Sequence, residues 1–398
     1  MKFNIWKDCP KVPITELLSF IVDNRGKTVP TADDGWKLIA TNCVTNNTLF
    51  PVYEKVRYLT QETYETWFRA HPIPGDILFV NKGTPGRVCL VPDPVDFCIA
   101  QDMIALRADD EKIYNKYLFA VLRSREIQQQ IYNTNVGDVI PHFKKQFMDQ
   151  LLIPVPDRRI QEIIGNLYYE LSYKTELNKK INNNLEQQME ALYKSWFIDF
   201  EPFNGAKPEN WSKTDIYSIA DIIYGAPFSS KLFNTDGVGK PIIRIRDLKN
   251  QEFVTYTTEE HPKGHLIQPG DIIVGMDGEF RPYIWGNESA WLNQRVCIFE
   301  NKRPKGKAFV FFTIKPLLNV IEQTQVATTV IHIGKKDYDA FEITLPDKTS
   351  LDRFDEITAP MIDQIVTNRL ENKQLAALRD ALLPKLMSGE LDVSNIDI

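Results

Sequence analysis

The feature that most constrains this chain is a long internal repeat. The segment Pro74-Gly75-Asp76-Ile77 returns 195 positions later as Pro269-Gly270-Asp271-Ile272. Further matches follow in the same order: Gln101-Asp102 with Gln294-Arg295, Val139-Ile140 with Val330-Ile331, Lys144-Lys145 with Lys335-Lys336, and Pro156-Asp157 with Pro346-Asp347. Solenoid repeats have periods of only about 20–50 residues. The spacing therefore predicts two duplicated domains within the 398 residues.

Each repeat is followed by a segment with the apolar spacing of a long helix. In the first segment the positions that step by threes and fours are Ile160, Ile164, Leu167, Leu171, Lys174, Asn178, Ile181, Leu185, Gln188, Leu192 and Trp196. This pattern predicts a coiled-coil helix of about 40 residues, or about 60 Å. We expect the polar seam positions Lys174, Asn178 and Gln188 to weaken the seam and to fix its register.

The second helical segment has the same character. Its seam positions are Phe354, Ile357, Met361, Ile365, Asn368, Asn372, Leu375, Leu378, Leu382 and Leu386. We expect Pro360 to divide it into a short helix and a longer one that begins at Met361. Gly389 is a suitable C-terminal cap. The simplest packing is one helix antiparallel to the other; the alternative is that each helix folds back on its own domain.

The globular halves show mixed patterns, which predict an α/β (α+β) fold. Short apolar runs bounded by Gly and Pro predict strands. These runs are Ile77–Val80, Arg87–Val91, Asp271–Gly275 and Val296–Phe299. The periodicity of Tyr114–Tyr132 predicts one helix. The alternation in Ile242–Arg246 predicts a half-buried strand with Arg244 and Arg246 on one face.

Composition narrows the cellular setting. The five cysteines are odd in number and contain no Cys-x-x-Cys pair, so reduced thiols in a cytosol are the simplest interpretation. The first residues lack the apolar stretch of a signal peptide, and no segment has the length of a membrane span, so we expect a cytoplasmic protein without membrane contact. The net charge of −6 predicts weak non-specific DNA binding, although one face of a domain can still gather cations.

Several strings resemble those of one known family. They are the repeated Pro-Gly-Asp-Ile, the Ile153-Pro154-Val155-Pro156 hinge, Tyr193-Lys194-Ser195-Trp196-Phe197, and Leu382-Leu383-Pro384-Lys385-Leu386-Met387-Ser388-Gly389. Together with the order of domains and helices, they resemble the specificity subunit of type I restriction-modification systems. The resemblance covers essentially the whole chain. The two globular parts share few residues beyond the framework, which fits two different half-sites.

The resemblance implies a non-catalytic subunit that recognises a bipartite sequence in double-stranded DNA. The implied domains are a first target-recognition domain at 1–156, a central helical spacer at 157–202, a second target-recognition domain at 203–346 and a C-terminal helical spacer at 347–398. The helices would act as spacer and as docking site for modification (methyltransferase) subunits, two in number, with restriction subunits joining through the complex. No cofactor is expected on this chain; magnesium, S-adenosylmethionine and ATP belong to the partners.

The residues that we expect to contact DNA are cations and amides in polar loops. Glycines allow close approach of the backbone to a phosphate or base, cations supply charged donors, and amides can read adenine. The predicted contacts are Arg25, Lys27, Lys82, Thr84, Arg87, Gln101, Arg244, Arg246, Arg281, Asn293, Gln294 and Arg295. Each of these side chains could also be an ordinary structural residue of a turn or strand.

The apolar ends of the two helices suggest a second kind of contact. Their side chains exceed what we expect a two-helix rod to bury, and large exposed aromatic patches often mark protein interfaces. The predicted partner-binding residues are Tyr193, Trp196, Phe197, Leu383, Leu386 and Met387. The alternative is that they pack under the neighbouring domain.

Catalytic motifs are largely missing. The sequence has no nucleotide-binding Gly-x-x-x-x-Gly-Lys-Ser/Thr loop, no His-Glu-x-x-His and no Asp/Asn-Pro-Pro-Tyr box. Asp93, followed by Asp110 and Lys112, loosely matches a magnesium-dependent nuclease. A nuclease, and a coiled-coil scaffold that does not bind DNA, are therefore the two alternatives to a specificity subunit.

Overall fold

The computed structural model describes residues 4–26, 28–134, 141–324 and 332–391, which form two compact units. Unit 1 contains residues up to Glu176 together with those from Gln374 onward, and unit 2 is Leu177–Lys373. Lys27 and the repeated Val-Ile pairs at 139–140 and 330–331 lie outside the described residues. In the part of the chain that is described, no helix is both long and apolar enough to cross a membrane.

In its described residues, unit 1 is built on three small sheets, one of them the pair β1-β9, and a set of helices. Its strands are Lys11–Pro13 (β1), Leu18–Val22 (β2), Trp36–Ile39 (β3), Arg57–Leu59 (β4), Ile77–Val80 (β5), Val88–Leu90 (β6), Phe97–Ile99 (β7), Met103–Ala108 (β8) and Leu152–Pro154 (β9). Its α-helices, apart from the two long ones, are Ile5–Asp8 (α1), Gln61–Thr66 (α2), Asn115–Leu122 (α3) and Arg125–Asn133 (α4). Its 3-10 turns are Ile14–Leu17, Thr41–Cys43 and Lys145–Gln150.

The main sheet of unit 1 has the order β2-β8-β5-β6, and the second sheet has the order β4-β3-β7 with β3 and β7 parallel. Alternate residues of the main sheet face opposite ways. Ile77 and Phe79 join a core with the helices, whereas Leu78 and Val80 join a core with the second sheet. The main sheet is therefore buried on both faces, which explains the continuous apolar run of β5.

Unit 2 repeats this plan. Its strands are Ser212–Asp215 (β10), Ala220–Tyr224 (β11), Phe233–Asn234 (β12), Lys240–Ile243 (β13), Tyr256–Thr257 (β14), Leu266–Ile267 (β15), Ile272–Gly275 (β16), Pro282–Ile284 (β17), Ala290–Leu292 (β18), Val296–Asn301 (β19) and Glu342–Leu345 (β20). Its two shorter α-helices are Lys307–Thr324 (α6) and Lys335–Asp339 (α7). Its 3-10 turns are Glu201–Phe203, Ile216–Ser218, Ser230–Leu232 and Ile245–Asp247.

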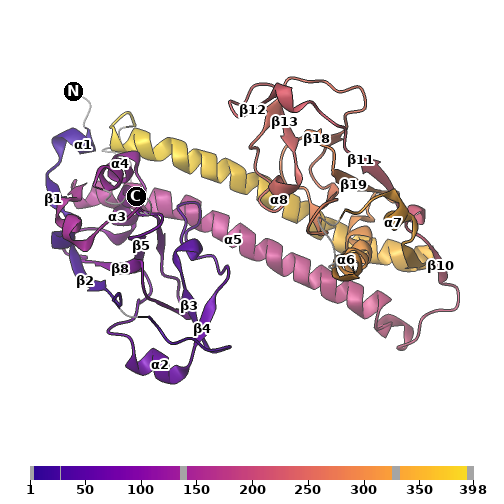
Figure 1. Ribbon diagram of the computed structural model, residues 1–398, viewed down its shortest axis with the longest axis horizontal. Helices are drawn as coiled ribbons and strands as arrows, with labels where there is room; N and C mark the ends of the chain where they lie inside the picture. The colour runs from indigo at the N-terminus through magenta and orange to yellow at the C-terminus, as the bar shows by residue number, and fades with distance from the viewer. Residues whose placement is uncertain (1–3, 27, 135–140, 325–331, 392–398) are drawn as a thin grey trace. The chain divides into compact units, whose positions relative to one another are not determined.

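The main sheets of the two units correspond strand for strand, while the second sheet has three strands in unit 1 and five in unit 2. The main sheet has the order β11-β19-β16-β17, and in the second sheet β13 and β18 are parallel like β3 and β7. The register also agrees, because Leu78 lies opposite Ala105 as Ile273 lies opposite Ile298. The predicted duplication is therefore present in the fold (Figure 1).

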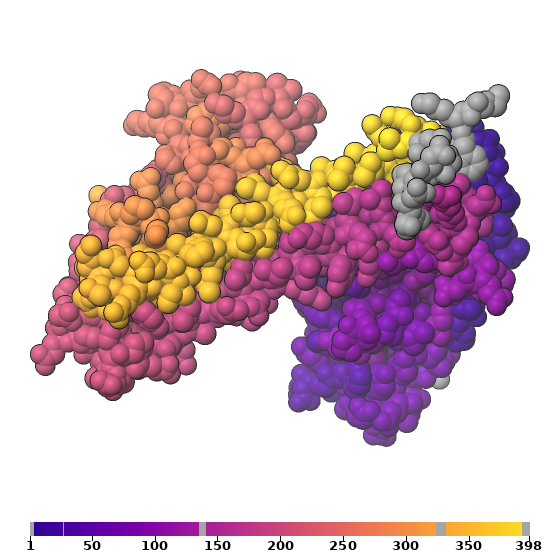
Figure 2. Space-filling model, turned by 180° about the vertical axis from the view of Figure 1, so that it is seen from behind, coloured from indigo at the N-terminus to yellow at the C-terminus, as the bar shows by residue number. Residues whose placement is uncertain are grey.

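The two long helices are Arg158–Phe197 (α5) and Lys348–Met387 (α8), and each contributes a segment to both units. They lie side by side in both views (Figures 1 and 2). In unit 1 the close approach of α5 to α3 occurs at Gly165, where a Cβ atom would stand 2.5 Å from the backbone nitrogen of Tyr117. Close packing of α5 on the domain thus requires glycine at this position.

The pairing of the helices within unit 2 is antiparallel, as predicted. The Asn178 amide donates to Asn372 Oδ1 at 2.9 Å, and one turn later the Asn368 amide donates to Asn182 Oδ1 at 2.8 Å. The residue number of the partner in α8 decreases as the residue number in α5 increases, so the two helices are antiparallel. The predicted role of Asn178 as a polar seam position is confirmed.

The rest of the predicted seam is partly wrong. Lys174, Ile181 and Gln188 are exposed, while the buried positions of α5 include Ser172, Thr175, Asn178, Asn182 and Met189. Small polar side chains occupy the middle of the seam because they form hydrogen bonds there, either across the pair or to a carbonyl one turn earlier. An assignment of the seam from hydrophobicity alone is therefore wrong at apolar positions that are exposed, such as Ile181.

Two local predictions are corrected by the structure, and a third is confirmed. Helix α8 continues through Pro360 without a break, because Phe354, Ile362 and Ile365 bury its apolar face on both sides of the proline. The predicted helix Tyr114–Tyr132 is two helices, and the Ser124 hydroxyl between them caps α4 by accepting from the Ile127 amide. Gly389 has the expected left-handed backbone, with φ of +72° after the end of α8.

Candidate nucleic-acid interface

The loop between β5 and β6 carries three of the predicted DNA contacts. Arg87 is exposed, and Lys82 and Thr84 are half-buried. Gly83 and Gly86 both have positive φ, at +84° and +88°, so the loop takes a conformation that side chains with a Cβ rarely adopt. The backbone of Lys82 pairs with that of His142. These contacts hold the loop at the edge of the main sheet.

The turn between β7 and β8 lies against this loop. Gln101 and Asp102 both have positive φ, at +30° and +57°. The carbonyl of Asp102 accepts from the amides of Asn81 and Lys82, at 2.7 and 3.2 Å. The Asp102 carboxylate also lies 4.0 Å from the Lys82 ammonium. The structure thus brings together two motifs, Lys82 and Gln101-Asp102, that the sequence places about twenty residues apart.

Arg25 lies in the loop after β2 and is held by a neighbour. Its guanidinium donates two hydrogen bonds of 2.8 Å to the Asp23 carboxylate, which also pairs with Lys145 at 3.4 Å. The hydrogen bond from Arg25 holds the pKa of Asp23 well below its usual range. Burial lowers the pKa of His142, and the nearby charges of Lys82, Arg25 and Lys144 lower it further. Cations from three segments therefore converge on His142.

Unit 2 has the same backbone frame with different side chains. The carbonyl of Arg295 accepts from the Met276 amide at 2.8 Å, and the backbone of Asp277 pairs with that of His332. Arg295 has φ of +71°, like Asp102 in the equivalent turn. Its guanidinium lies 3.9 Å from Asp277 and 2.9 Å from the His332 ring. The His332 ring lies 2.6 Å from the Asp277 carboxylate.

The remaining predicted residues of unit 2 divide by exposure. Arg281 and Gln294 are exposed, and Arg281 lies 3.7 Å from Glu279. Asn293 is buried at 8% exposure, and its amide donates to the Ile243 carbonyl at 3.3 Å. Asn293 therefore belongs to the frame of the turn, with Gln294 and Arg295 presented beyond it.

The predicted strand face of Arg244 and Arg246 is wrong. Strand β13 ends at Ile243, and the chain turns into the 3-10 segment that starts at Ile245, because the Asp247 carboxylate accepts from the Arg244 amide at 3.1 Å. The Arg244 side chain donates to the Thr255 hydroxyl and lies over the Phe233 ring. Arg246 remains exposed. The two guanidinium groups thus have different surroundings.

Sequence reasoning missed four members of these clusters: Asp102, His142, Asp277 and His332. A signal was present, since Gln101-Asp102 and Gln294-Arg295 were matched as repeats. Asp102 and Arg295 occupy the second position of these matched pairs, and their opposite charges gave no indication that the two residues have equivalent places. The histidines lie beside segments whose pairing only the fold reveals.

Of the six predicted partner-binding residues, four are buried in cores, and Tyr193 and Trp196 are half-buried against one, so the expectation that they form exposed patches is wrong. Tyr193, Trp196 and Phe197 pack with Phe309 and Phe354 in unit 2. The other three, Leu383, Leu386 and Met387, complete the main core of unit 1 and are at most 6% exposed. The physical reason is that each unit uses the end of a long helix to close its own core.

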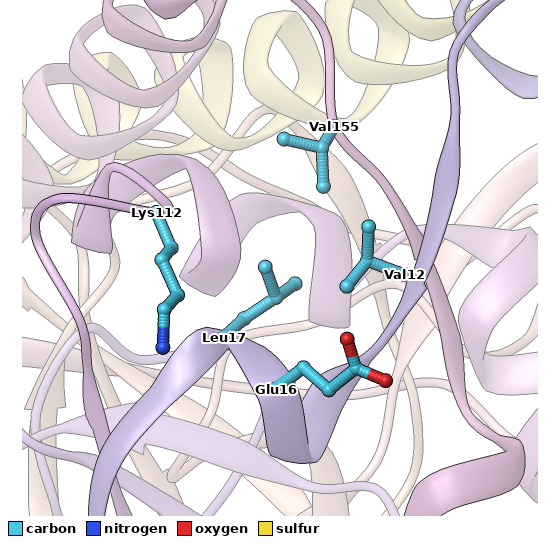
Figure 3. Close-up of a pocket in the computed structure, with 5 residues that line it drawn as sticks. All are labelled: Val12, Glu16, Leu17, Lys112 and Val155. Carbon is cyan, nitrogen blue, oxygen red and sulfur yellow. The ribbon is translucent and has the colours of Figure 1, made fainter.

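An open pocket of about 480 Å³ lies at the other end of β8 from the Gln101-Asp102 turn (Figure 3). Its lining is Val12, Glu16, Leu17, Lys112 and Val155. Lys112 pairs with Asp109 at 2.9 Å. Among the described residues, no three His, Cys, Asp or Glu side chains are grouped closely enough to hold a metal ion. The residues suggested for a nuclease thus form no such group.

Comparison with known proteins identifies the family. The family model for the type I restriction modification DNA specificity domain matches residues 14–187 and 208–379, once in each repeat. The chain belongs to this family. As a specificity subunit, it is a DNA-recognition component of a type I restriction-modification system and not one of the catalytic subunits.

Individual relatives agree with this assignment. The chain is 23% identical over 343 residues to the type I restriction enzyme MjaIX specificity subunit of Methanocaldococcus jannaschii, covering 81% of this chain and 79% of that protein. It is 30% identical over 194 residues to the EcoBI specificity subunit of Escherichia coli, covering 48% and 41%. A crystal structure of the S subunit from M. genitalium has the same fold, with a TM-score of 0.55, 17% identity, and 97% and 98% coverage.

Proposed function

We propose that each unit of this specificity subunit reads one half of a split DNA sequence through the two loops that meet at the edge of its main sheet. The single observation that supports this most is their equivalence. In both units the loop after the Pro-Gly-Asp-Ile strand meets the turn before the central strand, with the same backbone hydrogen bonds and a charged pair between them. Exposed cations beside these loops, Arg87 and Arg281, suit phosphate contacts.

The proposal assigns different tasks to the residues. Lys82, Arg87, Arg281 and Arg295 supply charged donors, while Gln101 and Gln294 are placed to read base edges. Thr84, Arg25 and Arg246 would contact the backbone of the duplex, together with Lys27, which lies outside the described residues. Arg244 and Asn293 would act by shaping the loops, since their side chains are engaged within the unit or buried.

The test is a map of methylated adenines in cells that carry the chain with its modification subunit. Arg281→Ala or Gln294→Ala is expected to relax only one half of the target, by about 1–3 kcal/mol for each lost bidentate contact. Lys348→Ala is the matched control, because it removes a cation of unit 2 that is 89% exposed on α8. Equal relaxation of both halves by Arg281→Ala would contradict reading by separate units.

We propose that the modification subunit binds to the outer face of α5. We also propose that two modification subunits bind. Leu177 and Ile181 lie four residues apart in unit 2 and are 39% and 37% exposed. Side chains four residues apart share one helix face, so they form an apolar pair on α5. Leu177→Ser with Ile181→Ser should abolish co-purification of the modification subunit, whereas Ile198→Ser, at another exposed isoleucine, should not. Restriction subunits would join this complex in the cytoplasm.

A further inference from the structure

The charged pairs of the two units occupy equivalent positions with their signs exchanged. Strand pairing aligns β8 with β19, since Val80 lies opposite Met103 as Gly275 lies opposite Val296. The residue before each of these central strands is Asp102 in unit 1 and Arg295 in unit 2. The opposite loop supplies Lys82 in unit 1 and Asp277 in unit 2. We refer to Lys82–Asp102 and Asp277–Arg295 as the exchanged pairs.

The surroundings of the exchanged pairs are also equivalent. A histidine pairs by its backbone with the loop residue in each case, His142 with Lys82 and His332 with Asp277. The next residue along donates its amide to the loop, Phe143 to the Asn81 carbonyl at 2.7 Å and Ile333 to the Met276 carbonyl at 2.9 Å. These backbone hydrogen bonds are therefore shared, and the side chains decide on which side the positive charge lies.

A contribution to folding stability does not explain the exchanged pairs. Side-chain exposures are 44% and 47% for Lys82 and Asp102, and 52% and 28% for Arg295 and Asp277. Ion pairs this open to solvent contribute little to folding. Their separations, 4.0 and 3.9 Å, are also too long for a direct hydrogen bond between the two partners of either pair. A role toward a ligand explains conserved geometry with reversed charge better than a role in folding.

We propose that the polarity of the exchanged pair determines which bases each unit accepts at one position of its half-site. In unit 1 an ammonium stands on the β5–β6 loop and a carboxylate on the turn; in unit 2 a guanidinium stands on the turn and a carboxylate on the loop. Guanidinium and ammonium groups donate to guanine O6 and N7, whereas a carboxylate accepts from cytosine N4. Reversing the pair moves donor and acceptor to opposite sides of the contact.

Within unit 2, His332 and Asp277 act as positioning residues for Arg295. The His332 ring lies within 2.6 Å of the Asp277 carboxylate and 2.9 Å of the guanidinium, so it bridges the two charged groups. A fixed guanidinium plane is what bidentate recognition of a base requires. This inference rests on the proposed reading of DNA by the loops, and it adds the acidic partners and their polarity.

The main test exchanges the charges of unit 2. Asp277→Lys with Arg295→Asp gives unit 2 the polarity of unit 1 while keeping a pair. The chain is produced with its modification subunit, and the methylated sequence is mapped. The second half-site is expected to change at one position, with methylation of the original sequence lowered about 5- to 150-fold, and the first half-site to stay as it was. Retention of the original sequence at the original rate by the folded variant would overturn the proposal.

The control exchanges a pair that is distant from the loops. Lys213 and Glu342 pair between β10 and β20 and are 70% and 62% exposed. Lys213→Glu with Glu342→Lys alters the same charges on the same unit, and the methylated sequence should not change. If the wild-type complex itself methylates without sequence preference, the proposed function fails. If it has a preference that the exchange at Asp277 and Arg295 leaves intact, only this inference fails.

A second set of variants covers the case in which the exchanged variant does not fold. Asp277→Asn and Arg295→Lys keep size and remove only the negative charge and the planar fork. Both are expected to relax recognition at the same base position. The double variant should lose no more specificity than the more strongly affected single variant, because the two residues act as one contact. A structural role would instead lower methylation of all sequences equally. Effects at different positions, or independent additive effects, would overturn the proposal.

Discussion

The central strands of the two units carry opposite charges at both ends. Asp102 before β8 corresponds to Arg295 before β19, and Arg107 near the end of β8 corresponds to Glu300 in β19. Between these ends the strands are apolar and buried in both units. The comparison separates two kinds of position: the apolar middle, which must fill the same space in each unit, and the charged ends, which face solvent or variable neighbours and are free to reverse.

The second reversal changes how the shared Pro-Gly-Asp-Ile motif is stabilised. Asp76 is 2% exposed, and Arg107 donates to it twice at 2.9 Å. Asp271 has Glu300 at the position of the arginine and the Lys307 ammonium nearby, and burial raises the pKa of Asp271. In both units the same carboxylate accepts from a backbone amide three residues earlier, from Ile73 at 2.9 Å and from Gln268 at 2.7 Å. Both units thus share the turn, whereas the Arg107–Asp76 ion pair has no counterpart at Asp271 among the residues that the structure describes.

The largest effect is expected where each helix end closes a core. Phe197→Ala should destabilise unit 2 by about 3–5 kcal/mol, because the ring is 7% exposed and contacts Phe309, Phe354 and Trp211. Denaturant unfolding followed by the fluorescence of Trp211 would measure this loss. Ile198→Ala is the control, since this neighbour is 56% exposed and should change stability little. A loss below about 1 kcal/mol for Phe197→Ala would contradict its place in the core.

The next effect concerns the ion pair that distinguishes the units. Arg107→Ala should cost unit 1 about 2–3 kcal/mol, because it leaves the buried Asp76 carboxylate without its cation; partial exposure of Arg107 keeps the loss below that of a fully buried pair. Glu300→Ala, at the equivalent position, should be neutral or slightly stabilising for unit 2. Hydrogen exchange of β5 and β16 amides would report each unit separately. Equal losses in both units would mean that the comparison is drawn between the wrong residues.

The smallest effect is the pH dependence that Asp271 contributes to the stability of unit 2. Burial raises the pKa of Asp271, so between its ordinary and its folded pKa the native state binds more protons than the unfolded state. The stability of unit 2 should therefore fall as pH rises through this window and be greatest below it. Asp271→Asn cannot ionise and should remove this part of the slope. Unfolding free energies measured across acid pH would show the difference, and an unchanged slope in the variant would contradict it.

Much of this architecture follows from the sequence, because repeated strings and apolar runs depend on local pattern. Strands β5, β16 and β19 lie where runs bounded by glycine and proline predict them. The seam of the long helices does not follow from the sequence, since the side-chain amides of residues such as Asn182 and Asn368 are buried by pairing with each other. No count of hydrophobic residues reveals a pairing across nearly two hundred residues. The same holds for Phe197, whose ring packs against Phe309 of α6.

The sequence predicts the cationic residues of the candidate site but not the acidic and histidine residues that contact them. Lys82, Arg87 and Arg281 stand in polar loops that glycine and charge already indicate. Asp102 and Asp277 were hidden because acidic residues are not expected in a DNA-binding loop, and His332 because its contacts with Asp277 and Arg295 are entirely tertiary. Arg244 was misjudged for a local reason, since Asp247 ends the strand three residues too early for the predicted face.

The closing of unit 1 by Leu383, Leu386 and Met387 has a consequence for synthesis on the ribosome. Unit 2 is a continuous segment, Leu177–Lys373, and can complete its core as soon as it has emerged. Unit 1 is translated first, yet its core waits for residues made more than two hundred codons later. At about 5–20 residues per second, the nascent first unit would stay unfinished for tens of seconds. A premature stop codon after unit 2 would therefore damage the domain farthest from it in the gene, leaving the nearer one whole.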